Sequence, residues 1–277
     1  MQFFCKIWDW KRQWFQVLIL FLIVFIDWRF NVPDFLKSIV TKSGVPIEAL
    51  DPKWRIVLGG GIIIFTAFVF IGVYIGFRNA NERTEIRQSI LRSTVWHSYV
   101  GYWFCRYILG YKKISLIRVP IPKQFQIVCY NLFDVDKDEL KDIATKDEDV
   151  VRVSYYNDSL FTSEIVLILS DTYSLDRDKV DIDSLKNLTT IVVDRSSDDH
   201  TRYYSPKFIS TINNEVHRLP NSVETIHLFA TMNPSNCYHV ASDIFMTGGR
   251  DSWKHLYVYE QNKDTWKFDR KKRVKAF

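Results

Sequence analysis

Polar side chains follow short apolar runs in the second half of the chain, and their types suit the binding of an anion. Hydroxyl, amide and guanidinium groups can all donate hydrogen bonds to a phosphate. One cluster also opens a predicted helix, where free backbone N–H groups favour negative charge. We therefore predict a ligand-binding site here. Its candidate residues are Ser170, Asp171, Thr172, Tyr173, Arg195, Thr231, Met232, Asn233, Pro234, Ser235 and Asn236.

The turn from Asn233 to Asn236 is the strongest candidate within this site. Asn233 and Pro234 open a predicted helix directly after a predicted strand. Ser235 and Asn236 add side-chain donors to the backbone N–H groups at that helix start. The alternative is that Asn233 and Ser235 only cap the helix, which is the commoner role of such residues.

Arginine and tyrosine side chains supply the rest of the predicted site. Arg195 is placed to pair with a phosphate, and Arg202 is the alternative. Tyr173 is placed to stack on a base, with Tyr203 and Tyr204 as alternatives. A plainer interpretation is that the arginine bridges a neighbouring aspartate and that the tyrosines pack on the surface.

The sequence carries no motif of a catalytic or metal site. None of the six histidines belongs to an H-E-x-x-H pair, and there is no G-x-S-x-G or phosphate-binding P-loop. Asp134, Asp136 and Asp138 have the spacing of a calcium loop, but Glu139 stands where that loop needs glycine. We therefore predict no catalytic residue, no metal and no cofactor apart from the ligand.

Alternating strand and helix patterns predict the elements that position the candidate residues. Ser205-Pro206 and Asn233-Pro234 have the composition of helix starts. The β-α-β-α-β order implies a parallel, Rossmann-like sheet with right-handed crossovers, in which ligands bind beyond the carboxyl ends of the strands. The predicted strands are Phe125–Cys129, Ile165–Leu169, Thr190–Val193, Glu224–Ala230 and His255–Tyr259.

The first third of the chain is poor in charge and contains two apolar segments. Ile56–Phe77 is a run of 22 uncharged residues, and as a helix it would rise about 33 Å, enough for the hydrocarbon core. Val17–Ile26 is shorter, and Trp14 and Trp28 would extend it into the two interfaces. We predict a membrane hairpin of two helices. The alternative, a cleaved signal peptide, lacks a small-residue cleavage site.

Basic residues and two glycines refine the prediction for this hairpin. Seven Lys and Arg residues flank its outer ends and five lie between the spans, so a modest positive-inside bias places both termini in the cytoplasm. Gly72 and Gly76 would allow close helix association, unless glycine is simply common in such helices. The predicted organisation is a two-helix transmembrane region at 1–78, a juxtamembrane linker or helix at 79–113 and an α/β domain at 114–277.

The charge distribution limits the partners of the α/β domain. The formal net charge is +5. Residues 134–199 nevertheless hold 18 acidic and 8 basic side chains, a net of −10. An acidic surface binds the phosphates of long DNA or RNA poorly. The four cysteines form no C-x-x-C pair, which favours reduced thiols over a disulfide scaffold.

Three stretches carry a family resemblance. They read SPKFISTINNEVHRL, VETIHLFATMNPSNCYHVASDIF and KHLYVYEQNKDTW. They resemble the C-terminal half of SAVED domains, the ligand sensors of bacterial CBASS anti-phage systems, which are built from two CARF-like halves. The resemblance covers about residues 164–268 and extends faintly back to 115. One departure is that the family tends to have glycine in the helix where Ser242 and Asp243 stand here.

Two membrane helices before such a domain are similar to the transmembrane SAVED effectors of CBASS. The resemblance implies a cyclic oligonucleotide ligand made by a partner nucleotidyltransferase. It also implies a homo-oligomer that forms on ligand binding and disrupts the lipid bilayer, causing abortive infection. The chain is then expected to be a multi-pass protein of the bacterial inner membrane with no enzymatic activity. Two alternatives remain open, a membrane-anchored scaffold with a nucleotide-fold interaction domain and an anchored hydrolase with an unrecognised site.

Overall fold

The chain folds as two compact units. The first comprises residues 1–92 and 107–112, and the second comprises residues 93–106 and 113–277. The short segment 107–112 therefore belongs with the N-terminal helices, although the sequence on either side of it belongs to the second unit. The computed structural model describes residues 15–25, 52–86, 98–135, 145, 150–157, 162–175, 180, 185–195, 202–246, 253–262, 265 and 267–277.

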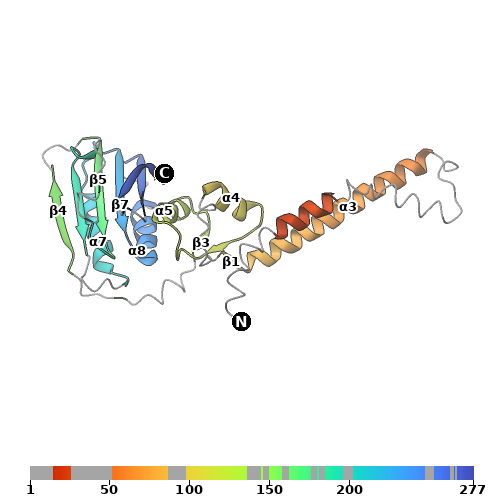
Figure 1. Cartoon of the computed structure of the whole chain (residues 1–277), viewed down its shortest axis with the longest axis horizontal. Coiled ribbons are helices and arrows are strands. Elements are labelled where there is room, and N and C mark those ends of the chain that lie inside the picture. Colours follow the sequence, from red (N-terminus) through yellow and green to blue (C-terminus); the bar gives the residue numbers. More distant parts are fainter. Residues whose placement is uncertain are drawn as a thin grey trace. The chain divides into compact units, whose positions relative to one another are not determined.

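The first unit is built on a helix at residues 15–25 and the long helix α3 (Pro52–Glu82), which lie alongside each other in Figure 1. A buried amide pair joins them, because the side chains of Gln16 and Asn81 donate to each other at 2.9 Å in both directions. Asn81 Nδ2 also donates to the carbonyl oxygen of Leu109 at 2.8 Å. One asparagine thus ties three segments of this unit together.

The segment 107–112 approaches α3 at a position that accepts only glycine. The hydroxyl of Tyr74 donates to the carbonyl oxygen of Ile108 at 3.0 Å. Two residues further on, Gly110 has a φ of +80°, and a Cβ added there would lie 2.3 Å from Cγ of Arg78. Both the left-handed backbone and the close approach require a residue without a side chain.

The predicted two-helix transmembrane region is wrong, because no helix in the described part of the chain is long and apolar enough to cross a bilayer. The described residues of the first helix, 15–25, rise about 16 Å, against roughly 30 Å of hydrocarbon. The expected multi-pass placement in the inner membrane, with both termini in the cytoplasm, depended on these spans and is corrected with them.

The second unit contains a six-stranded sheet with the order β4-β6-β5-β7-β8-β9 (Figure 1). The four central strands run parallel, and β4 and β9 pair antiparallel at the two edges. The predicted parallel sheet is therefore present, with antiparallel edge strands added. The strands are β4 (Arg152–Tyr156), β5 (Glu164–Ser170), β6 (Thr190–Asp194), β7 (Thr225–Thr231), β8 (His255–Gln261) and β9 (Phe268–Lys275).

Strands β5 and β7 form the centre of the core. Every residue of β7 is buried, and in β5 only Glu164 is exposed. Near-continuous apolar strands are typical of parallel sheets, whose two faces are both covered. Val166 and Ile168 of β5 belong to a core cluster in which Phe229 stacks on Tyr259, with ring centres 4.3 Å apart. This packing fixes the central strands whose carboxyl ends are described below.

The predicted helix starts at Ser205 and Asn233 are confirmed. The hydroxyl of Ser205 accepts a hydrogen bond from the backbone N–H of Phe208 at 3.2 Å. The side chain of Asn233 accepts one from the backbone N–H of Asn236 at 2.9 Å. Each cap residue is followed by a proline in the first turn, a position where proline fits without loss of a hydrogen bond. The elements that begin here are α7 (Pro206–His217), α8 (Pro234–His239) and the π-helix η5 (Val240–Met246), which continues α8.

One predicted strand, Phe125–Cys129, is a helix instead. It forms most of α5 (Ile121–Cys129), in which Phe125 and Val128 are buried. A short apolar run does not by itself distinguish a strand from a buried helix. Pro122 in the first turn was the available signal for a helix start. The remaining elements are β1 (Glu85–Ile86), α4 (Tyr99–Tyr107) and the parallel pair β2 (Lys113–Ile114) and β3 (Asp134–Val135).

Candidate ligand-binding site

The chain leaves β5 and β7 in opposite directions across the sheet. The next strand after β5 is β6 on one side of it, and the next strand after β7 is β8 on the other side. Ligands of open α/β sheets bind beyond the carboxyl ends of strands at such a switch point. The backbone N–H groups of Asp171 and Thr172 both donate to the carbonyl oxygen of Thr231, each at 3.0 Å. The ends of β5 and β7 are thereby fixed together.

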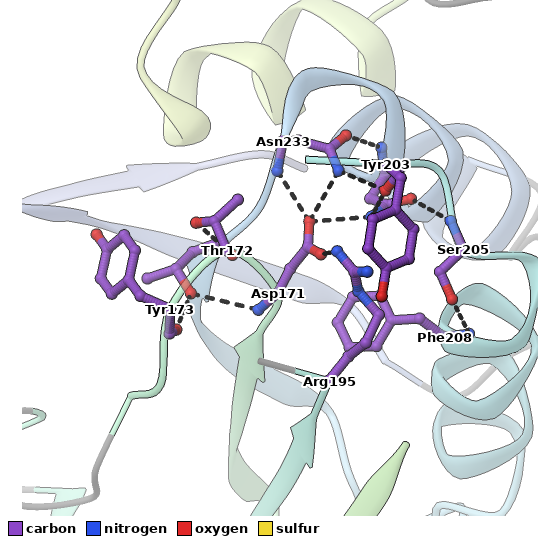
Figure 2. Close-up of polar contacts among 10 residues, drawn as sticks. Asp171, Thr172, Tyr173, Arg195, Tyr203, Ser205, Phe208 and Asn233 are labelled. Atoms are coloured by element: carbon purple, nitrogen blue, oxygen red, sulfur yellow. Dashed lines mark hydrogen bonds and ion pairs between the residues drawn. The ribbon is translucent and has the colours of Figure 1, made fainter. Parts of the chain in front are cut away.

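The carboxylate of Asp171 is the centre of a buried polar cluster at this point (Figure 2). Its Oδ1 is paired with the guanidinium group of Arg195. Its Oδ2 accepts hydrogen bonds from the backbone N–H of Asn233 at 2.9 Å, from Asn233 Nδ2 at 3.1 Å and from Asn236 Nδ2 at 2.9 Å. We call Asp171, Arg195, Asn233 and Asn236 the Asp171 cluster. None of the four is more than 2% exposed, and such burial is tolerated because the charges are paired and hydrogen-bonded.

The Asp171 cluster also holds the segment that leads into α7. Nδ2 of Asn233 and Nδ2 of Asn236 donate to the carbonyl oxygen of Tyr203, at 2.9 Å and 3.2 Å. Oδ1 of Asn236 accepts from the backbone N–H of Ser205 at 3.2 Å. The guanidinium carbon of Arg195 lies 4.0 Å from the centre of the Tyr203 ring, within the range of a cation–π interaction. Backbone and side chain of this segment are therefore both anchored at the strand ends.

Thr172 and Tyr173 continue from β5, and Figure 2 shows the Tyr173 ring pointing away from the buried carboxylate. The hydroxyl of Tyr173 donates to the side chain of Gln261. The backbone carbonyl oxygen of Tyr173 accepts a hydrogen bond from Thr231 Oγ1 at 2.8 Å. Burial raises the pKa of Tyr173, while the hydrogen bond to Gln261 and the positive charge of Arg202 act in the opposite direction. The phenol is therefore neutral at physiological pH, and its ring is half-buried at this edge.

The structure brings the eleven predicted residues together at the carboxyl ends of β5, β6 and β7. Most of their side chains face inward and bond to one another. Thr172, Tyr173 and Pro234 are half-buried. The fully buried members are Ser170, Asp171, Arg195, Thr231, Met232, Asn233, Ser235 and Asn236.

The two glycines predicted to mediate helix association lie in the first unit, on α3. Gly72 and Gly76 are both exposed. A Cβ added at either position would meet no atom within 4 Å. Within this chain, no described residue packs closely on that face of α3.

Sequence reasoning underrated the segment that precedes α7. Tyr203 and Ser205 supply a carbonyl and an N–H to the Asp171 cluster. The eleven predicted site residues include neither of them, and Tyr203 is predicted only as an alternative for stacking on a base. The available signal was topological. In a parallel sheet the connection from β6 to α7 must start at the carboxyl edge, so its residues lie beside the ends of β5 and β7. Gln261, at the end of β8, reaches the same edge through Tyr173.

The described residues contain no arrangement suited to metal binding, since no group of three or more His, Cys, Asp or Glu side chains comes together among them. His227 is used internally, with Nδ1 2.9 Å from the hydroxyl of Tyr259 and Nε2 3.0 Å from a carboxylate oxygen of Glu164. Burial raises the pKa of the Cys129 thiol to about 12 and that of Cys237 well above its ordinary value. Both thiols are free and protonated, so neither is an activated nucleophile.

A parallel sheet with polar groups gathered at its switch point is an α/β architecture, and the site lies where α/β sheets commonly bind ligands. The sequence matches the family described as "SMODS- and Ubiquitin system-associated 2TM effector domain" over residues 1–276, and the chain belongs to this family. The predicted membership of the CBASS effector proteins is thereby confirmed. A comparison with curated proteins finds no match.

Solved structures of a SAVED/CARF-domain containing receptor, Cap4 of Acinetobacter baumannii, are similar to this chain. The complex with the cyclic trinucleotide 2'3'3'-cAAA is 10% identical with a TM-score of 0.43, and the match covers 65% of this chain and 43% of the receptor. The complex with 3'3'3'-cAAA has the same identity and TM-score and is covered to 44%. A further Cap4 structure is 8% identical with a TM-score of 0.37 and is covered to 41%. The match thus spans less than half the length of these receptors.

Proposed function

We propose that the protein is an anti-phage effector that is switched on by a cyclic oligonucleotide bound at the carboxyl edge of its sheet. The observation that carries this proposal is the polar cluster at the β5–β7 switch point, which is where α/β sheets bind ligands. Membership of a SMODS-associated effector family supports the same function. The protein acts by binding and assembly, and it performs no chemical step on its ligand.

The eleven residues at the strand ends form the proposed ligand site, in two layers. The buried layer, centred on the Asp171 cluster, gives the edge its shape. The half-buried layer contains Thr172, Tyr173 and Pro234, which offer a hydroxyl, an aromatic ring and an apolar surface. A ring of this kind stacks on a nucleobase with little dependence on base identity.

The proposed output is ligand-driven self-association followed by disruption of a membrane. The family description, which names an effector domain, supports an output of this kind. A ligand can drive assembly only if it binds the assembled form more tightly than the single chain. The exposed face of α3 around Gly72 and Gly76 is the proposed contact between copies, because glycines four residues apart permit close helix approach.

Two assays on the full-length protein test this function. Isothermal titration with a panel of cyclic di- and trinucleotides, including 3'3'3'-cAAA and 2'3'3'-cAAA, should find at least one ligand that binds. The same ligand should cause dye to leak from phospholipid vesicles mixed with the protein. Binding without leakage would overturn the proposed membrane disruption but not the proposed ligand binding. No binding by any member of the panel would instead favour a scaffold that uses its α/β domain for protein contacts.

A further inference from the structure

Two arginines lie at the carboxyl edge of the sheet, and the structure uses them differently. Arg195 is 2% exposed, is paired with Asp171 and lies against the ring of Tyr203. Separating it from the carboxylate would leave two unpaired buried charges, which is strongly unfavourable. Arg195 is therefore committed to holding the protein together and has little charge to offer a ligand.

Arg202 has the opposite character. Its side chain is exposed, and among the described residues it has no ion-pair partner. The backbone beside it is anchored, because the next residue, Tyr203, has its carbonyl oxygen held by Asn233 and Asn236 at 2.9 Å and 3.2 Å. The Asp171 cluster thus holds the backbone next to an exposed arginine at the strand ends.

The charge of Arg202 acts on the same edge that Tyr173 occupies. It lowers the pKa of the Tyr173 hydroxyl, against the larger effect of burial. Tyr173 is itself fixed by Gln261 of β8 and by Thr231 of β7. The exposed Arg202 precedes the anchored Tyr203, and the half-buried Tyr173 follows β5, so both belong to the carboxyl edge of the sheet. Together they match the two parts of a nucleotide, its phosphate and its base.

We propose that Arg202 is the residue that pairs with a phosphodiester of the ligand, and that the Asp171–Arg195 pair holds the site from beneath without touching the ligand. This inference rests on the proposed function and makes it more specific. The guanidinium group of Arg202 donates two parallel hydrogen bonds to the phosphate oxygens, a geometry that lysine does not reproduce. Recognition of the phosphate then depends on the arginine that the sequence offers as the alternative to Arg195.

Three variants of the full-length protein test this assignment by titration with the best binder of the cyclic di- and trinucleotide panel. Arg202→Gln should weaken binding roughly tenfold or more, the loss of a charge-assisted hydrogen bond, and should reduce the dependence of affinity on salt. Arg202→Lys should recover part of the affinity. Arg218→Gln is the matched control, because Arg218 is also exposed and ends α7 beside Glu215. It should bind as the unchanged protein does.

The outcomes separate this inference from the function on which it rests. Unchanged affinity of Arg202→Gln, with an unchanged melting temperature, would overturn the role of Arg202 and leave the sensor standing. An equal loss in Arg218→Gln would show a general charge effect and would also overturn it. If the unchanged protein binds no member of the panel, the proposed function fails, and the assignment of Arg202 fails with it.

Discussion

Asp171 is the side chain on which the carboxyl edge depends most, because one carboxylate satisfies donors from the residue after β6, from the N-cap of α8 and from α8 itself. Replacing it with alanine leaves the guanidinium group of Arg195 buried without its partner. We expect Asp171→Ala to lower the free energy of unfolding by about 3–5 kcal/mol. Urea denaturation measures this loss directly.

A second aspartate provides the control for that experiment. Asp243 pairs with His239 on the surface, and its side chain is 55% exposed. Exposed pairs of this kind contribute about 0–1 kcal/mol. A loss in Asp171→Ala no larger than that in Asp243→Ala would contradict the structural role of the Asp171 cluster.

Tyr173 allows the ring and the hydroxyl to be tested separately. Tyr173→Phe removes the hydroxyl, which donates to Gln261, and keeps the ring, so ligand affinity should change little. Tyr173→Ala also removes the ring, and the loss of a stacked base should weaken binding by about 1–3 kcal/mol. Titration of both variants gives the comparison. Equal affinities of the two variants would exclude stacking at this position.

At the scale of single elements, replacing glycine by alanine should have opposite effects on stability at Gly110, in a turn, and at Gly76, in the helix α3. Gly110→Ala should destabilise the protein by more than about 1 kcal/mol, because the backbone has a positive φ and the added Cβ meets Arg78. Gly76→Ala is the control, because Gly76 is helical with open space around it. Alanine there should stabilise the helix by about 0.5–1 kcal/mol. Thermal unfolding followed by circular dichroism shows the sign of each change, and a shared sign would contradict this account.

The elements predicted best from the sequence are those bounded by strong local signals. Ser205-Pro206 and Asn233-Pro234 mark α7 and α8 because a cap followed by proline has a local physical cause. The apolar runs of β5, β6, β7 and β8 were also predicted as parallel strands, whereas their order in the sheet was not. Phe125–Cys129 had no comparable boundary, and a five-residue apolar run fits a buried helix turn as well as a strand.

The location of the candidate site at the carboxyl edge of the sheet was predictable from the sequence. The contacts that its side chains make were less predictable. Parallel topology alone brings Asp171, Thr231 and Asn233 to one edge. The direction of each side chain depends on partners that are distant in sequence, such as the carbonyl oxygen of Tyr203 for Asn233 and Asn236. For the same reason, the sequence predicts Arg195 as a ligand contact, whereas in the structure Arg195 forms an internal ion pair with Asp171.

At the scale of the whole molecule, the proposal requires ligand binding in one unit to change association through the other. Gly72→Leu fills the exposed glycine face of α3. It should therefore reduce ligand-driven assembly and leave ligand affinity unaltered. Ala67→Leu, at an exposed position on the opposite side of the helix, is the matched control. Analytical ultracentrifugation with and without the ligand distinguishes the two. Equal assembly of both variants would show that copies associate through another surface.

The most direct test of the central claim is the structure of the full-length protein with its best-binding cyclic oligonucleotide. We expect the ligand to lie over the carboxyl ends of β5 and β7, with a base against Tyr173 and the Asp171 cluster unchanged beneath it. A ligand bound at any other place on the molecule, with this edge left open, would contradict the account.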